Sequence, residues 1–104
     1  MRWLVDPWQN RVALTDERWQ HICDHPEVEA RLAEVVETVR SPDVIIQSRA
    51  DERAALFYRR YPGHVRGAPL LCVVVKYGDS ASDPFVVTAY YAERRKQGEV
   101  LCQP

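Results

Sequence analysis

Cysteine, whose disulfides stabilise small secreted domains, is scarce in the sequence, and so is glycine. The chain holds three cysteines and four glycines among 104 residues, and Cys23, Cys72 and Cys102 are widely spaced with no Cys-x-x-Cys pair. An odd number of distant cysteines argues against a disulfide framework. We expect each to behave as a small hydrophobic residue, with Cys72 inside a strand. Only Cys23, which lies between two histidines, has a functional alternative.

Long apolar runs are missing too. No run approaches the roughly 20 residues that span a bilayer. The first residues, MRWLVDPW, lack the apolar segment of about 7 to 15 residues found in a secretory signal peptide. The formal net charge of −1 does not favour a nucleic-acid partner as a strongly basic chain would. We therefore predict a cytoplasmic protein that has no membrane partner.

The residues that are present are sufficient to form a core. With 46% hydrophobic and 28% charged residues, the chain can bury apolar side chains beneath a charged surface. Its length matches one domain, and no internal repeat, low-complexity tract or linker divides it. We predict a single domain over residues 1–104, composed of a short β-ribbon (1–14), helices (15–40), a sheet (43–91) and a tail (92–104).

Two helices are predicted after the ribbon. Thr15 is a good N-cap, and acidic residues follow it in the first turn, where the helix dipole favours them. This predicts a helix from about 15 to 24. Pro26 interrupts its hydrogen bonding but suits the first turn of another helix. Apolar residues at helical spacing then predict a second helix from about 27 to 39.

From residue 43 the pattern changes to alternating or continuous apolar residues, many of them β-branched or aromatic. We predict strands over 43–49, 54–61, 69–77 and 84–91. Short, turn-rich connections favour antiparallel neighbours. The predicted fold class is α+β, with two N-terminal helices packed on a four-stranded antiparallel meander sheet and a short N-terminal β-ribbon.

Strand alternation divides the predicted sheet into two faces, although the register is a choice that the sequence does not fix. One choice places polar and aromatic side chains on one face: Gln47, Arg49, Tyr58, Arg60, Lys76, Thr88 and Tyr90. The opposite face, toward the helices, then receives Ile46, Phe57, Val73, Val75, Phe85 and Val87. Ordinary solvent exposure explains the polar face equally well.

Interleaved arginine and tyrosine suit a polynucleotide, because arginine neutralises phosphate and a tyrosine ring can stack on an unpaired base. RNA cleavage also needs a base, an acid and cationic groups that stabilise charge on phosphorus. His21 and His25 lie four residues apart in HICDH, and histidine suits either proton-transfer role. Surface exposure, or capping of a helix C-terminus by His25, is the plain alternative.

A metal site is the weaker interpretation of these histidines. Two histidines at i and i+4 can share zinc, but HICDH lacks the glutamate of the His-Glu-x-x-His pattern. A third ligand could only be guessed as His64 or Asp24. We therefore predict neither a metal nor a cofactor.

The order of LTDERWQHICDHPE, SPDVIIQSR, LFYRRY, LLCVVVKY and FVVTAYY resembles the barnase/EndoU/colicin/RelE-like (BECR) nuclease superfamily, in particular its phage-associated branch. The resemblance spans about residues 11 to 100. It implies metal-independent endoribonuclease activity, often as a toxin or effector, which an antitoxin or immunity protein would neutralise. It matches the helix histidine to His21 or His25, the basic sheet position to Arg49 or Arg60, and the late-strand hydroxyl to Thr88.

The leading hypothesis is therefore an RNA-cleaving enzyme that uses 2'-hydroxyl transesterification. In it, His21 or His25 is the acid or base, Arg49 and Arg60 hold phosphate, and Thr88 orients the scissile group. The predicted substrate-binding residues are Tyr58, Lys76 and Tyr90. One alternative is a non-catalytic module that binds RNA or protein. Another is a homodimerisation domain whose interface includes Trp3, Trp8 and Tyr91.

Overall fold

The computed structural model describes residues 1–78 and 83–104. The chain begins with an antiparallel hairpin of β1 (Arg2–Val5) and β2 (Arg11–Leu14). Its turn is organised by Asp6, which is 1% exposed. The Asp6 carboxylate accepts hydrogen bonds from the backbone N–H groups of Trp8 and Asn10 at 2.9 and 2.8 Å, from Asn10 Nδ2 at 3.0 Å and from the Tyr77 hydroxyl at 2.8 Å. The predicted ribbon is therefore present, and the hydrogen bond from Tyr77 attaches its turn to a distant part of the chain.

Three helices follow: α1 (Asp16–Ile22), α2 (Pro26–Glu29) and α3 (Leu32–Arg40). The N-cap prediction is confirmed, because the Thr15 hydroxyl accepts from the Arg18 backbone N–H at 3.1 Å. The single helix predicted over 27–39 is wrong, because the backbone leaves helical geometry at Ala30 and Arg31. The break lies between two fully buried residues, Val28 and Val35, and turns both helices toward one core. Among the described residues, no helix has the length and apolar character to cross a bilayer.

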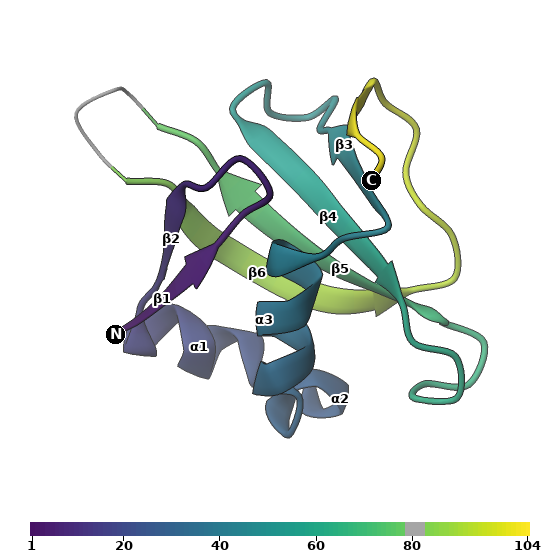
Figure 1. The fold of residues 1–104 in the computed structure, drawn as a ribbon. Coiled ribbons are helices and arrows are strands. Elements are labelled where there is room, and N and C mark those ends of the chain that lie inside the picture. The colour runs from purple at the N-terminus through teal and green to yellow at the C-terminus, as the bar shows by residue number, and fades with distance from the viewer. Residues whose placement is uncertain (79–82) are drawn as a thin grey trace.

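The remaining strands are β3 (Val44–Gln47), β4 (Ala54–Arg60), β5 (Leu70–Lys76), β6 (Phe85–Ala92) and β7 (Val100–Cys102). They join the hairpin in one seven-stranded sheet of order β1-β2-β6-β5-β4-β3-β7 (Figure 1). β2 pairs with β6 in parallel, so the sheet is mixed. The predicted fold class is therefore wrong: the four predicted strands form an antiparallel centre, but three further strands extend it and three short helices accompany it.

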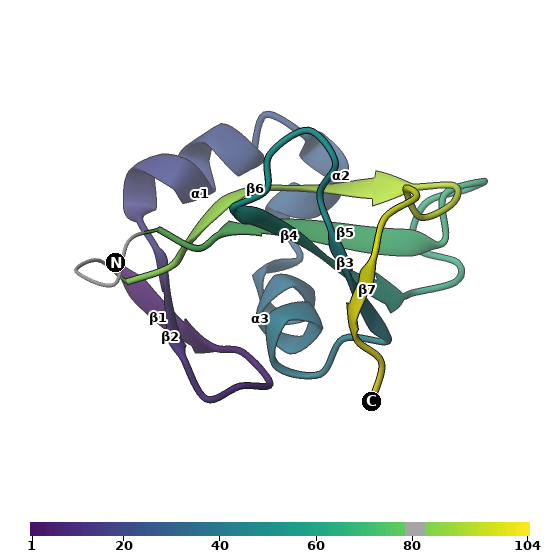
Figure 2. The ribbon, with the colours of Figure 1, turned by 90° about the horizontal axis from the view of Figure 1, so that it is seen from above.

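Contacts between distant segments extend the sheet at both edges. The Ala13 backbone N–H donates to the Pro84 carbonyl at 2.8 Å, which attaches the hairpin to β6. At the other edge, the Gln47 N–H donates to the Glu99 carbonyl at 2.8 Å, where β7 joins β3. Figure 2 shows the hairpin and β7 at opposite sides of the molecule.

Both faces of the central strands are buried. The first core joins the helices to one face, with Ile22, Val28, Val35, Val39, Phe57, Leu71, Val73 and Val75 among its members. The second core, on the opposite face, consists of Val44, Ile46, Leu56, Tyr58 and Cys72, with Leu70, Val74 and Tyr90 packed against it. A sheet buried on both faces does not show the clean alternation of a half-exposed one.

The predicted register holds in the middle of the sheet and fails at its ends. Phe57, Val73 and Val75 face the helices as predicted. Ile46 faces the second core instead, because three consecutive apolar residues in β3 give no alternation to read. Val74 and Val75 of β5 pair with Thr88 and Val86 of β6, respectively. Val87 is therefore an extra residue in a β-bulge of β6. The bulge puts Val86 in the first core, and Phe85, beside Lys76, falls on the opposite face from the one predicted.

The C-terminal segment, residues 93–102, covers the second core. The Lys96 backbone N–H donates to the Tyr58 hydroxyl at 3.0 Å, and Lys96 Nζ lies 5.9 Å from the centre of the Tyr90 ring. Gly98 allows the close approach, since a Cβ there would collide with the Gln47 carbonyl oxygen and the Ile46 side chain. The predicted polar face is therefore largely the floor of a covered core.

Candidate functional site

The two histidines of HICDH lie on the surface of the helical layer. His21 Nδ1 is 3.9 Å from an Asp24 carboxylate oxygen, and His25 Nδ1 is 3.9 Å from a Glu27 oxygen. Their side chains are 62% and 47% exposed. Burial raises the pKa of the Cys23 thiol between them, with the Glu29 and Asp24 carboxylates adding to the rise, which disfavours the nucleophilic thiolate.

The predicted phosphate-binding residues lie on the other side of the sheet. Arg60 follows Tyr58 by two positions in β4 and shares its face. Arg49 lies just beyond β3, where its Nη1 donates to Gln97 Oε1 at 3.4 Å. Thr88 pairs with Val74 on that same face. The sheet therefore separates His21 and His25 from Arg49, Arg60 and Thr88, and the structure does not bring the predicted catalytic set together.

The three predicted substrate-binding residues differ in exposure and in their contacts. Tyr58 is 1% exposed, and burial raises its pKa to about 12. Burial raises the pKa of Tyr90, and the Cys72 thiol beside its buried hydroxyl raises it further. Lys76 Nζ forms an ion pair with an Asp51 oxygen at 2.9 Å. Tyr58 is therefore enclosed in the second core, whereas Tyr90 and Lys76 are half-buried.

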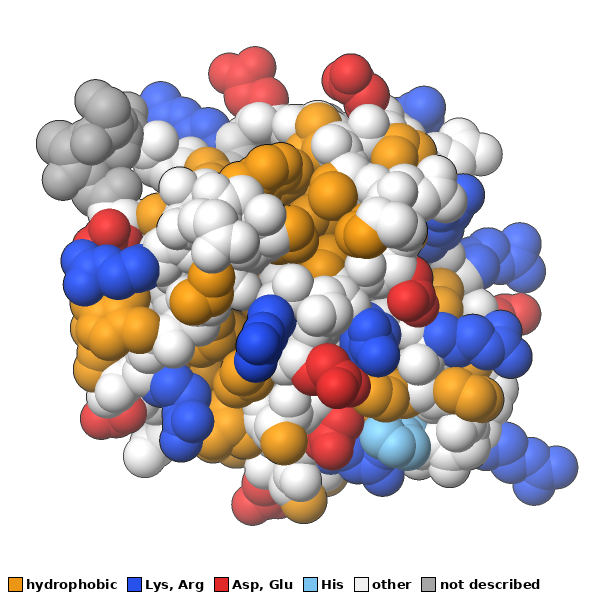
Figure 3. All heavy atoms as spheres, in the orientation of Figure 1, with side chains coloured by type: hydrophobic (Ala, Val, Ile, Leu, Met, Phe, Trp, Pro, Cys, Tyr) orange, Lys and Arg blue, Asp and Glu red, His pale blue; other side chains and the backbone are white. Residues whose placement is uncertain are grey.

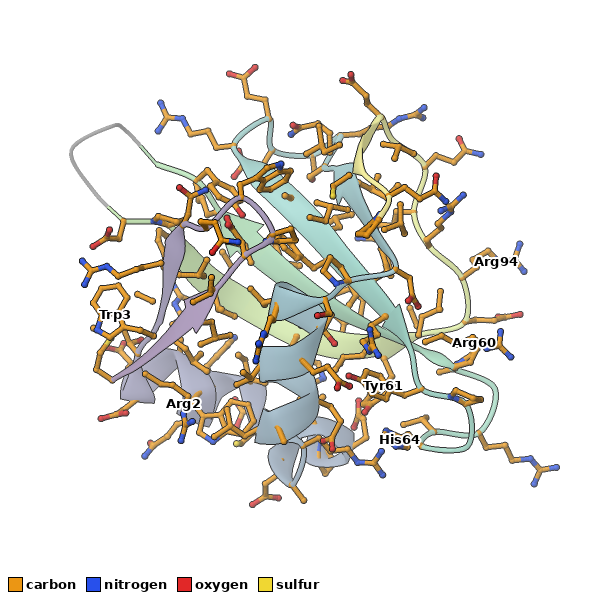
Figure 4. All side chains as sticks on the ribbon, in the orientation of Figure 1. Arg2, Trp3, Arg60, Tyr61, His64 and Arg94 are labelled. Atoms are coloured by element: carbon orange, nitrogen blue, oxygen red, sulfur yellow. The ribbon has the colours of Figure 1, made fainter. Side chains whose placement is uncertain are left out.

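A different group of polar side chains meets at the end of the sheet where β4 ends. We call it the His64 cluster, and its members are Arg31, Glu37, Arg59, Tyr61, His64 and Tyr91. They come from the segment before α3, from α3, from β4 and the loop after it, and from β6. Figure 4 shows Tyr61 and His64 side by side at this end, on the same side of the molecule as Arg60 and Arg94.

His64 is held by two tyrosines. Its Nδ1 lies 3.1 Å from the Tyr91 hydroxyl, and its ring stacks on Tyr61 with centroids 5.1 Å apart and planes at 15°. Arg31 Nη1 donates to the same Tyr91 oxygen at 3.4 Å. A neutral ring with its hydrogen on Nε2 accepts from the Tyr91 hydroxyl at Nδ1, whereas the protonated ring carries hydrogen on both nitrogens and donates from Nδ1 to the Tyr91 oxygen. The ring is thus oriented with Nε2 available for proton transfer.

A carboxylate forms the second half of the cluster. The Tyr61 hydroxyl donates to Glu37 Oε1 at 2.5 Å, and Arg59 Nε lies 3.2 Å from the same oxygen. The Tyr61 hydrogen bond, supported by Arg59, lowers the pKa of Glu37 below its usual value. Burial and the Glu37 bond raise the pKa of Tyr61 to about 12. At neutral pH, Glu37 is therefore an ionised acceptor and Tyr61 a neutral donor.

Glu34 adds an unsatisfied group to the same region. Its Oε2 is buried and has no hydrogen-bond partner among the described residues. Burial raises the pKa of Tyr91, and the Glu34 and Glu27 carboxylates add to that rise against the opposing effect of Arg31. A buried acceptor without a partner is costly, so a hydrogen-bond donor that reached this oxygen would be bound favourably.

Basic side chains lie at the same end of the sheet as the His64 cluster, with Arg60 on the face of the second core. β4, β5 and β6 are in register at this end, since Arg60 pairs with Leu70 and Leu70 with Ala92. The loop after β4 and the segment after β6 are therefore neighbours. The end of β4 and these two segments together carry four exposed arginines, which we call the basic rim: Arg60, Arg66, Arg94 and Arg95. Figure 3 shows Lys and Arg side chains gathered along this side of the molecule.

No protein-family model, curated protein or solved structure matches this chain. The resemblance to the BECR superfamily therefore stays a prediction based on short motifs. In residues 1–78 and 83–104, no three histidine, cysteine, aspartate or glutamate side chains are grouped so that they could hold a metal ion. The site must be interpreted from the geometry of its own residues.

The sequence offered His64 as a site residue only as a guessed third metal ligand, although it lies in a local basic cluster with Arg66, and it gave no role to Arg31 or Glu37. One signal was available: His64 follows Pro62 and Gly63 in a connection between strands, and a histidine on a loop held by a rigid scaffold is a reasonable functional candidate. The dimer interface suggested from Trp3, Trp8 and Tyr91 is not one surface. Trp8 packs edge-on against Tyr77 at the end of β5 remote from Tyr91.

Proposed function

We propose that the chain is a metal-independent endoribonuclease whose chemistry is carried by the His64 cluster. The observation that carries the proposal is the connected set of an oriented histidine, an ionised carboxylate and two guanidinium groups within one network. Transesterification of RNA requires these functions: a base, an acid and cationic stabilisation of the phosphorane.

In the proposed reaction, Glu37 accepts the proton of the 2'-hydroxyl while its oxygen forms a bond to phosphorus. In its protonated form, His64 donates the Nε2 proton to the 5'-oxygen as the bond between that oxygen and phosphorus breaks, and the ring is left neutral. The products are a 2',3'-cyclic phosphate and a free 5'-hydroxyl. Arg31 and Arg59 stabilise the negative charge that builds on the phosphoryl oxygens, and both guanidinium groups already lie in the cluster.

The basic rim suits the phosphates that flank the scissile bond. Arg60 thus keeps the phosphate-binding role that the sequence suggested, whereas the acid moves from His21 or His25 to His64. RNA is the proposed partner, and the cytoplasm, where RNA is accessible, is the proposed compartment.

The test compares cleavage of end-labelled structured RNA in excess chelator by the wild type, His64→Ala and a His21→Ala/His25→Ala control. Loss of a general acid slows a reaction by roughly 10²- to 10⁴-fold, so His64→Ala should lose that factor. The control should cut at the wild-type rate, because its histidines lie on the surface of the helical layer. A loss of cutting confined to the control would place the chemistry on the helix and refute this assignment.

A non-catalytic RNA-binding module is the second candidate, favoured by the basic rim and the stacked rings of Tyr61 and His64. It predicts tight binding of RNA without product. For such a module, the logarithm of the binding constant should fall linearly with the logarithm of the salt concentration, and removal of Arg94 and Arg95 should reduce the slope. RNA bound with this salt dependence but never cut would favour the module over the enzyme.

A further inference from the structure

The outer edge of β1 is an unpaired edge of the sheet among the described residues. In the hairpin, the Asp6 N–H donates to the Asn10 carbonyl at 3.1 Å. Hydrogen-bonded pairs alternate along an antiparallel ladder, so Leu4 bonds toward β2 whereas Trp3 and Val5 turn their backbone groups outward. Trp3 and Val5 are each 44% exposed. β1 therefore offers two free N–H and two free C=O groups to an added strand.

This free edge borders a hollow beside α3. The hollow has a volume of about 510 Å³, and it is lined by Trp3 to Pro7 and Gln9 from the hairpin and by Val36, Arg40 and Ser41 from the end of α3. Figures 1 and 2 both place β1 and α3 on the same side of the molecule. Half-buried Val36 supplies apolar surface to the hollow, and Leu4, which is 1% exposed, lies behind it in the first core. The space thus has a strand edge on one wall and a helix on the other.

The charge of the hollow selects among occupants. Two charged side chains line it, Asp6 and Arg40. The Asp6 carboxylate is already saturated by the hairpin turn and Tyr77. Arg40 is exposed, and it has no ion pair among the residues that the structure describes. A bound segment with a carboxylate opposite Arg40 would form an ion pair with its guanidinium group.

We propose that the hollow binds an extended acidic peptide segment of another protein, which adds to β1 as a further strand. The backbone of the segment would pair with Trp3 and Val5, its apolar side chains would pack on Val36, and a carboxylate would face Arg40. A second copy of this chain is a poorer occupant, because its own β1 carries Arg2 and no acidic side chain. The inference is independent of the proposed nuclease activity.

The probe is a pool of eight-residue peptides in which valine or threonine alternates with aspartate or glutamate. A matched pool has lysine at the acidic positions. Binding is followed by the amide resonances of Trp3 and Val5 and by their protection from hydrogen exchange. The acidic pool should shift and protect both amides, and the lysine pool should bind at least about tenfold more weakly.

Two variants and one control locate the binding. Arg40→Glu removes the complementary charge and should weaken binding of the acidic pool by about tenfold or more. Val5→Pro removes an outward N–H at an edge position, where proline is tolerated, and should abolish the shift at Trp3. Arg18→Glu, an exposed change on α1, should leave binding unchanged, and RNA cleavage should be unaffected by Arg40→Glu.

Three results would overturn the proposal. One is the absence of binding by the acidic pool at millimolar concentration to folded protein. Another is binding that Arg40→Glu and Val5→Pro both leave intact. The last is self-association by sedimentation that Val5→Pro abolishes, which would assign the edge to a second copy of the chain.

Discussion

The buried carboxylate in the hairpin turn gives a prediction whose size follows from the structure. Asp6 accepts four hydrogen bonds, one of them from the Tyr77 hydroxyl at 2.8 Å. Burial raises the pKa of Tyr77 well above its ordinary value, and the bond to Asp6 raises it further. Tyr77 is thus a neutral donor to a buried acceptor. Tyr77→Phe removes that donor and leaves the rest of the turn in place.

A hydrogen bond to a charged group contributes about 1.5 to 3 kcal/mol, so Tyr77→Phe should lower the free energy of unfolding by about 2 kcal/mol. At a urea m-value of about 1.5 kcal/mol/M, this shift moves the unfolding midpoint by about 1.3 M. Asp6→Ala should cost more, because it also orphans the backbone N–H groups of Trp8 and Asn10.

The assay is equilibrium urea unfolding of the wild type, both single variants and the double variant, followed by tryptophan fluorescence and circular dichroism. The double variant should lose less than the sum of the singles, since the two groups share one interaction. A Tyr77→Phe midpoint within about 0.2 M of the wild type, or strictly additive losses, would refute the assignment of this hydrogen bond.

Three further predictions concern stability. Tyr90→Phe should change the unfolding free energy by less than about 1 kcal/mol in either direction, because the buried hydroxyl that it removes lies beside the Cys72 thiol, a weak hydrogen-bonding group; a loss above about 1 kcal/mol by urea unfolding would contradict this. Gly98→Ala should lower the free energy of unfolding by about 1 to 3 kcal/mol through the collision with the Gln47 carbonyl oxygen. A melting temperature equal to that of the wild type would contradict this. The pKa of Glu37 is lowered on folding from 4.5. The stability it contributes is therefore complete above pH 4.5 and lost as the pH falls through the folded value. Glu37→Gln should flatten the acid limb of a pH series of unfolding free energies, and an unchanged acid limb would count against the Tyr61 bond.

Local signals in the sequence were sufficient for the local elements. Thr15 marked the start of the first helix, and the β-branched runs marked the four central strands, because caps and periodicity act within a few residues. The hairpin was predicted, but its pairing with β6 and the strand β7 were missed, because both depend on distant partners. β7 is three residues long and pairs with β3. A segment as short as Val100–Cys102 is too short to show the alternation that predicts a strand.

The site was missed for a similar reason. His64 contacts Tyr91, which is 27 residues away, and Tyr61 contacts Glu37, which is 24 residues away. His21 and His25 attracted attention because their spacing is local and visible. Side chains that act together across a sheet leave no such spacing, and the covered second core removed the polar face on which the first hypothesis depended.

The position of β7 has a consequence for aggregation, because β7 is the strand at the edge of the sheet beside β3. β3 is a run of valine and isoleucine that would be an apolar sheet edge without its neighbour, and such edges template aggregation. β7 replaces that edge with a three-residue strand, and short edge strands are a common protection against aggregation. The C-terminal segment that ends in β7, residues 93–102, also covers the second core, where the Lys96 backbone N–H donates to the Tyr58 hydroxyl. Detachment of this one segment would expose both an apolar edge and an apolar face, so fibril formation should begin there rather than at β1.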